Sequence, residues 1–113
     1  MLNFLEISKR AYLHCSNVKD TKEVRECINE SWHAYYYCHI IKDRPEIAKY
    51  ITDSSWAYNY CRAVKDRPSV RKLITDSWDA YRYCKNIKDR PSIRKRITEE
   101  DHLQYYQDWK DEQ

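Results

Sequence analysis

Cysteine and histidine are the residues of this 113-residue chain that could act as nucleophiles, bases or metal ligands. Four of the five cysteines recur every 23 residues: Cys15, Cys38, Cys61 and Cys84. They form no Cys-x-x-Cys pair, so the zinc-binding spacing is missing. His14 precedes Cys15 and His39 follows Cys38, but adjacent side chains on a helix point about 100° apart and do not face each other. We therefore expect buried packing cysteines, with no catalytic residue, no metal site and no cofactor.

Glycine is absent from the chain. Phosphate-binding loops, dinucleotide-binding loops and nucleophile elbows all require glycine, so none of these enzyme motifs can be present. Tight type I′ and II′ hairpin turns are disfavoured for the same reason, which disfavours a β-rich fold. The sequence predicts a helical protein that is not an enzyme.

The aromatic residues are the more unusual feature, with eleven tyrosines, four tryptophans and one phenylalanine. Tyr37, Tyr60 and Tyr83 fall at the edge of an apolar helical stripe, where packing is expected. A second tyrosine row, together with two tryptophans opposite the stripe, could either fill the seams between units or form an exposed contact patch. As candidate partner-binding aromatics we take Trp32, Trp78, Tyr35, Tyr58 and Tyr81; Tyr12 begins the same row.

A ladder of basic residues supplies the other candidate binding site. Its members sit in three equivalent turns: Lys42, Arg44, Lys65, Arg67, Lys88 and Arg90. Three interpretations stay open, namely a solvated turn, contact with an acidic protein surface, and contact with phosphates. The third would combine arginine with aromatic residues, as single-strand nucleic-acid binders do.

These residues are positioned by an internal repeat of 23 residues. Four gap-free units cover residues 8–30, 31–53, 54–76 and 77–99, and the last two units agree at 14 of 23 positions. Seven columns are identical in all four units: Ser8/31/54/77, Ala11/34/57/80, Tyr12/35/58/81, Cys15/38/61/84, Lys19/42/65/88, Asp20/43/66/89 and Ile28/51/74/97. Such a period is typical of stacked repeat architectures.

Each unit is predicted to fold as two short helices. Ala80, Cys84 and Ile87 form one apolar stripe behind Ser77, which we expect to cap the first helix. The second helix opens at Asp-Arg-Pro, with proline in its first turn and the aspartate as its N-cap. Isolated helices of this length are marginal in water, so stability must come from stacking units on one another.

The two ends are expected to be helical caps. Phe4 and Ile7 extend the first stripe, and a capping helix over residues 99–110 follows Thr98 as its N-cap. The column of Cys27, Tyr50 and Leu73 is expected to be core, and its last member, Arg96, is expected to meet water.

The spacing Ala-Tyr-x-Tyr-Cys, then Val-Lys-Asp-Arg-Pro, then Val-Arg-x-x-Ile resembles the short tandem repeats of an uncharacterised helical-repeat domain. That domain occurs in proteins of phages, large viruses and intracellular bacteria, with an Ala-Leu-x-Tyr-Ala-Ser core followed by Leu-Lys-x-Asp and Glu-Val-Val. The resemblance covers residues 8–99 and departs from the pattern in Tyr for Leu, Cys for Ala, and the Arg-Pro pair. It implies a helical array, and it implies no chemistry.

The sequence therefore predicts one domain over residues 1–113, an all-α solenoid of four 23-residue helix-turn-helix repeats with helical N- and C-terminal caps. The function we expect is a non-catalytic protein-binding module, a phage or mobile-element product that binds and modulates a host protein complex. The alternative is a nucleic-acid binder using the Lys/Arg ladder, although the net charge is only +3. No apolar run reaches membrane-spanning length and no signal peptide is evident, so we expect a cytoplasmic protein, in the host cytoplasm if phage-encoded, without membrane contact.

Overall fold

Longer and shorter helices alternate along the chain in the computed structural model, which describes residues 3–113 and leaves the Phe4 side chain undescribed. The longer helices are α1 (Phe4–Asn17), α3 (Ser31–Tyr36) with its π-helical continuation η1 (Tyr37–Ile41), α5 (Ser54–Ala63), α7 (Ser77–Asn86) and α9 (Glu100–Asp111). The shorter ones are α2 (Lys22–Arg25), α4 (Pro45–Ala48), α6 (Pro68–Arg71) and α8 (Pro91–Arg94). No strand occurs in residues 3–113, so the all-α prediction is confirmed for the part of the chain described.

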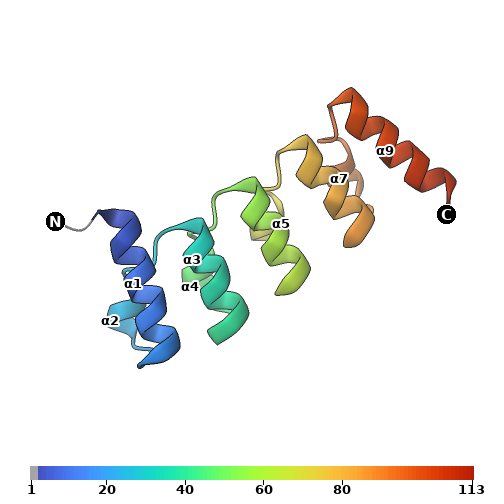
Figure 1. The fold of residues 1–113 in the computed structure, drawn as a ribbon. Helices are drawn as coiled ribbons and strands as arrows, with labels where there is room; N and C mark the ends of the chain where they lie inside the picture. Colours follow the sequence, from blue (N-terminus) through green and yellow to red (C-terminus); the bar gives the residue numbers. More distant parts are fainter. Residues whose placement is uncertain (1–2) are drawn as a thin grey trace.

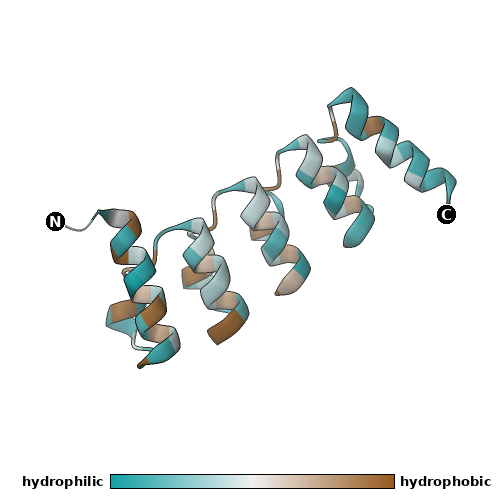
Figure 2. Ribbon diagram, in the orientation of Figure 1, coloured by the Kyte–Doolittle hydropathy of each residue, from teal (hydrophilic) through white to brown (hydrophobic). Residues whose placement is uncertain are grey.

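The longer helices lie side by side in chain order, and each shorter helix packs behind the longer helix that precedes it (Figure 1). The molecule is elongated, with principal dimensions of 50 × 26 × 20 Å. Its N- and C-termini lie at opposite ends (Figure 1). Colouring by hydropathy shows that α9, at the C-terminal end, is largely hydrophilic (Figure 2).

The core runs along the seam between the two sets of helices. The alanine, cysteine and isoleucine columns are buried in every unit, and Tyr37, Tyr60 and Tyr83 have no exposed surface. The packing predicted for these cysteines and tyrosines is thus confirmed. Cys27 was expected to be core, but its side chain is exposed and that prediction is wrong.

The serine column ties the start of each unit to the last two residues of the same unit, instead of capping its own helix. Ser54 Oγ accepts hydrogen bonds from the backbone N–H groups of Thr75 and Asp76, both at 3.1 Å. The same pair of bonds recurs at Ser8, Ser31 and Ser77. The prediction that Ser77 caps α7 is wrong, because Asp76 is the N-cap and Ser77 is already helical.

The aspartates of the Asp-Arg-Pro turns are not helix caps either. The N-cap residues of α4, α6 and α8 are Arg44, Arg67 and Arg90, and none makes a side-chain cap hydrogen bond. In the first unit the cap is Thr21, which accepts from the Val24 N–H. The expected proline in the first turn is confirmed in all three helices that contain it.

The longer helices end without glycine by widening into a π-type turn. The Lys65 N–H donates to the Tyr60 carbonyl at 3.2 Å, five residues back, and Lys19, Lys42 and Lys88 make the equivalent bond. No residue among those described has positive φ, so the usual left-handed helix terminus is not used there. The lysine column is therefore placed by its backbone, and its side chains are exposed.

Helix α9 repeats the contacts of the helices before it. Tyr106 donates to Asp89 across 17 residues, as Tyr83 does to Asp66, and His102 contacts Ser77 across 25 residues. It covers residues 100–111 rather than 99–110, and its N-cap is Glu99 rather than Thr98.

One other prediction about the ends needs correction. Arg96 does not simply meet water, since its guanidinium donates to the carbonyls of Arg71, Lys72 and Ile74. Ile7 is 37% exposed at the N-terminal end. The stripe position predicted for the Phe4 side chain lies outside the described structure.

Candidate protein-binding surface

Each junction between units is bridged by a tyrosine, an aspartate and an arginine. The Tyr60 hydroxyl donates to Asp43 Oδ1 of the preceding unit at 2.6 Å. Arg67 then donates through Nε to the same hydroxyl at 2.6 Å and through Nη2 to Asp43 Oδ2 at 2.8 Å. One arginine therefore binds both members of the Tyr60–Asp43 pair and closes the junction.

The bridge recurs at the neighbouring junctions with small changes. The corresponding sets are Tyr37–Asp20–Arg44, Tyr83–Asp66–Arg90 and Tyr106–Asp89, the last completed by Lys110. A further arginine five residues after the aspartate pairs with it at Asp20, Asp66 and Asp89. The second unit has Ala48 at that position, so Asp43 has Arg67 alone.

The surroundings of each bridge keep its aspartate ionised and its tyrosine neutral. Burial alone would raise the pKa of Asp43, but hydrogen bonds from Tyr60 and Arg67 hold that pKa below its usual value. Burial and the neighbouring Asp20 raise the pKa of Tyr37 to about 12. The tyrosine therefore stays a neutral donor and the aspartate an ionised acceptor near neutral pH.

The predicted basic ladder separates into two kinds of side chain. Arg44, Arg67 and Arg90 are held in the bridges and are largely covered, with 24–30% of the side chain exposed. Lys42, Lys65 and Lys88 are exposed, and no ion pair involves them in the described part of the chain. Partner binding by these six residues stays a prediction, but the structure gives the arginines a structural role that the sequence did not reveal.

The aromatic residues gather on the longer helices, in two groups. The first, which we call the aromatic cluster, consists of Tyr12 from α1, Trp32, Tyr35 and Tyr36 from α3, and Trp56 from α5. Trp32 and Trp56 are nearly parallel, with ring centroids 6.5 Å apart, and Tyr36 lies 5.9 Å from Trp56. Tyr35 also stacks on His39 at 5.6 Å.

The cluster remains open to solvent. Trp32 is 46% exposed, and the other four members are half-buried. The second group, on α7 and α9, contains Trp78, Tyr81, His102 and Tyr105, with Trp78 42% and Tyr105 47% exposed. Trp32 and Trp78 therefore combine ring-to-ring contacts with substantial exposed area.

Two of the predicted partner-binding tyrosines are buried. Tyr58 has no exposed surface, lies under the Arg82 guanidinium at 4.1 Å, and accepts a hydrogen bond from Asn86. Tyr81 is 8% exposed. Of the two alternatives left open for this row, both residues adopt the packed one, because a longer helix on either side covers them. Neither offers a partner appreciable ring area.

Sequence reasoning missed Trp56 and Tyr36 as members of a surface site. Trp56 is one position out of register with Trp32 and Trp78, in the column of His33 and Asp79, so the repeat alignment hides it. Both of those residues are buried, whereas Trp56 is half-buried beside Trp32. The irregularity of the column was the only signal in the sequence.

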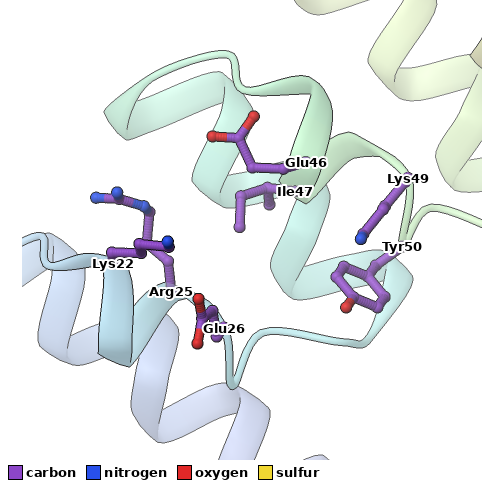
Figure 3. Close-up of a pocket in the computed structure, with 7 residues that line it drawn as sticks. All are labelled: Lys22, Arg25, Glu26, Glu46, Ile47, Lys49 and Tyr50. Carbon is purple, nitrogen blue, oxygen red and sulfur yellow. The ribbon is translucent and has the colours of Figure 1, made fainter.

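A groove between successive shorter helices lies apart from the aromatic cluster. It encloses about 230 Å³ between α2 and α4 and is lined by Lys22, Arg25, Glu26, Glu46, Ile47, Lys49 and Tyr50. Figure 3 shows charged side chains of both signs around it. With cations and carboxylates together, this groove selects for neither charge.

Charge is unevenly distributed along the chain. Residues 54–98 contain twelve Lys or Arg against four Asp or Glu, whereas residues 99–113 contain one lysine and six acids. All four acids of the basic segment are engaged, three in ion pairs with arginine and Asp76 as the N-cap of α7. The exposed lysines of the third and fourth units therefore dominate the local field.

Thiol chemistry is suppressed at the buried cysteines. Burial raises the pKa of Cys38 to about 11, of Cys61 to about 12 and of Cys84 to about 11, so each stays protonated at neutral pH. In the described residues no group of three or more Cys, His, Asp or Glu side chains could hold a metal ion.

Comparisons with known proteins leave the family open: no family model, curated protein or solved structure matched the chain. Among the described residues, no helix is long and apolar enough to span a membrane.

Proposed function

We propose that the chain is a solenoid of four 23-residue repeats, closed by the N-terminal extension of α1 and by α9, that binds a protein partner through the aromatic cluster. The recurrence of the serine bonds and of the Tyr–Asp–Arg bridges at a fixed separation supports the repeat architecture. The observation that carries the binding proposal is the exposed Trp32 ring, which is supported by Tyr36 and Trp56 at its back.

Such an arrangement suits an interface anchor. Exposed tryptophan and tyrosine dominate binding energy at protein interfaces, and side chains held in place lose little conformational entropy on binding. Trp32 is held by two other rings, and the rest of its surface is available. Apart from the exposed lysine column, the residues shared by all units pack in or against the core or form hydrogen bonds that hold the fold, so a partner would recognise features that the units do not share.

The test is affinity capture from extracts of the native host with the wild-type chain, followed by mass spectrometry. We expect the wild type to retain a partner and Trp32→Ala to retain it about tenfold less or weaker still. The reason is that truncating an aromatic hot-spot residue at an interface costs about 2 kcal/mol or more of binding free energy. Trp109→Ala is the matched control, since Trp109 is a half-buried tryptophan on α9 outside the cluster. Equal retention by Trp32→Ala and wild type would remove the proposal.

The resemblance to phage and large-virus repeats supports a further part of the proposal. We infer that the protein is a phage or mobile-element product acting in the host cytoplasm, where it modulates a host protein complex. If so, the captured partner should be a component of a host assembly whose activity changes when the chain is added. A partner encoded by the same mobile element would argue against action on a host complex.

Nucleic-acid binding is the second candidate, and the basic excess of residues 54–98 is the observation that favours it. Exposed Lys65 and Lys88 would contact phosphates, and Trp78 with Tyr105 would stack on bases. Binding would then weaken steeply with salt because counterions are released. Retention on single-stranded DNA or RNA at about 0.1 M salt would support this candidate, and absence of retention would exclude it.

A further inference from the structure

The grooves between successive shorter helices differ in size and in what fills them. The groove between α4 and α6 encloses about 450 Å³, roughly twice the α2–α4 groove. Its apolar lining is Pro45, Ala48, Ile51, Val70 and Leu73, and its polar lining is Lys49, Thr52, Arg67, Ser69 and Lys72. It is therefore a partly apolar groove bordered by cations.

Two columns of the repeat explain this difference. Ala48 stands where the other units have Arg25, Arg71 and Arg94, so a long side chain is missing from α4. At the next junction Arg96, the counterpart of Leu73, reaches back to the carbonyls of Arg71, Lys72 and Ile74, at 2.7 Å from the last. Leu73 cannot make these bonds, so the α4–α6 groove lacks the guanidinium that occupies the next one.

The charged side chains that line this groove are all cations, and one of them, Lys49, also lines the α2–α4 groove beside Glu26 and Glu46. No carboxylate lines it, and Arg67 is already bound to Asp43 and Tyr60. Lys49 and Lys72 are exposed and make no ion pair with any described residue; Lys49 rests 5.2 Å from the Tyr50 ring. The nearby acids are engaged, Glu46 with Arg44 and Asp66 with Arg71.

We propose that the groove between α4 and α6 binds an acidic peptide segment of a protein partner, with a carboxylate between Lys49 and Lys72 and an adjacent apolar side chain against Ala48, Val70 and Leu73. The charge complementarity selects a carboxylate, and the apolar floor selects its neighbour. This inference rests on the proposed function, because it adds a second contact with a protein to the one made by the aromatic cluster.

The chain itself suggests the blocking variant. Leu73→Arg places an arginine where Arg96 stands in the next unit, at the right separation to reach the carbonyls of Ala48, Lys49 and Ile51 and to fill the groove. Lys72→Glu reverses the charge at the rim without filling it. Lys95→Glu is its matched control, since Lys95 occupies the same column one unit later, beside the groove already filled by Arg96.

The experiment selects a phage-displayed random heptapeptide library on the full-length chain, with counter-selection on Leu73→Arg, whose helicity is checked by circular dichroism. We expect enrichment of peptides with Asp or Glu beside an apolar residue. A fluorescein-labelled enriched peptide should bind about tenfold more weakly to Lys72→Glu and within about twofold of wild type to Lys95→Glu and Trp32→Ala, as for loss of one charge pair.

Three outcomes would overturn the inference: no peptide enriched on wild type and lost on Leu73→Arg, enrichment of arginine- or lysine-rich peptides, or equal weakening by Lys72→Glu and Lys95→Glu. Enrichment of basic peptides would mean that the backbone carbonyls, rather than the lysines, select the ligand. Failure here with partner loss in Trp32→Ala would leave the proposed function standing. Peptide binding together with full partner retention by Trp32→Ala would support the groove and remove the proposed role of the aromatic cluster.

Discussion

At the scale of single residues, three buried tyrosine hydroxyls link neighbouring units through hydrogen bonds. Tyr37, Tyr60 and Tyr83 are fully buried, yet each hydroxyl both donates to an aspartate and accepts from an arginine. A buried aspartate without such donors would be costly, and a buried tyrosine without a partner would lose a hydrogen bond. The three side chains therefore depend on one another: without the Tyr60 hydroxyl, for example, Asp43 and Arg67 keep only the bond between Nη2 and Oδ2.

The first prediction concerns Tyr60→Phe, which keeps the ring and removes the hydroxyl between Asp43 and Arg67. We expect the free energy of unfolding to fall by about 1–3 kcal/mol, since a hydrogen bond to a charged group is lost in a buried setting. Urea denaturation monitored by circular dichroism measures it. Tyr50→Phe serves as control, because its hydroxyl makes no hydrogen bond with any described residue; an equal loss in both variants would contradict the role of the bridge.

The second prediction concerns His33, which is 2% exposed and pairs with Ser8 at 2.8 Å through Nδ1. Burial lowers its pKa below the usual 6.5; the nearby Glu30 opposes this shift and Lys9 adds to it. The unfolded chain therefore binds more protons than the folded one below this value, so stability is present above pH 6.5 and is lost as the pH falls.

We expect the unfolding free energy of wild type to decrease between about pH 7.5 and 5, and this decrease to shrink in His33→Asn. Urea titrations across that range measure both. A slope unchanged by His33→Asn would show that His33 does not set the pH dependence.

At the scale of elements, the positions of the helices could largely be predicted from the sequence, but the residues that cap them could not. The 23-residue period, the apolar stripes and the prolines place the shorter helices to within a few residues. Ser77 and Asp89 have the residue types of N-caps, but Ser77 binds the end of its own unit and His102 of α9, and Asp89 binds Tyr106 of α9. Capping propensity is a local rule, and here contacts 17 to 22 residues away in sequence compete with it and win.

The candidate site was predicted less well than the helices. Trp32 and Trp78 were correctly singled out as aromatic residues that project away from the core stripe. Tyr58 could not be placed, because a side chain about 100° from the stripe faces either solvent or the next helix, depending on how the units rotate relative to one another. That rotation is set by packing and is not encoded in any one unit.

The third prediction tests the serine links between elements. Ser54→Ala removes the acceptor for the Thr75 and Asp76 N–H groups, and we expect it to lower the unfolding free energy by about 1–3 kcal/mol. Ser55→Ala, at the next residue, removes an exposed hydroxyl and should be nearly neutral. Chemical denaturation of the two variants in parallel measures both unfolding free energies. Similar unfolding free energies for both variants would mean that the serine bonds contribute little to stability.

The whole molecule divides its residues between two tasks. Most of the repeated columns hold the fold, either within a unit or across a junction, and the unrepeated residues, such as Trp32, Trp56, Ala48 and Leu73, give the surface its distinct features. In the proposed solenoid, stability comes from interfaces between neighbouring units, so a weakened junction should weaken the fold as a whole. The arginines of the basic ladder hold the fold, and the exposed Trp32 of the aromatic cluster gives the surface its distinct feature.

The most direct test of this division measures unfolding free energy and partner retention together for Arg67→Ala and Trp32→Ala. We predict that Arg67→Ala loses about 1–3 kcal/mol of stability but retains the captured partner below its unfolding midpoint. We predict that Trp32→Ala stays folded and loses the partner. The opposite pattern, a stable Arg67→Ala that no longer binds and a Trp32→Ala that binds normally, would contradict the account.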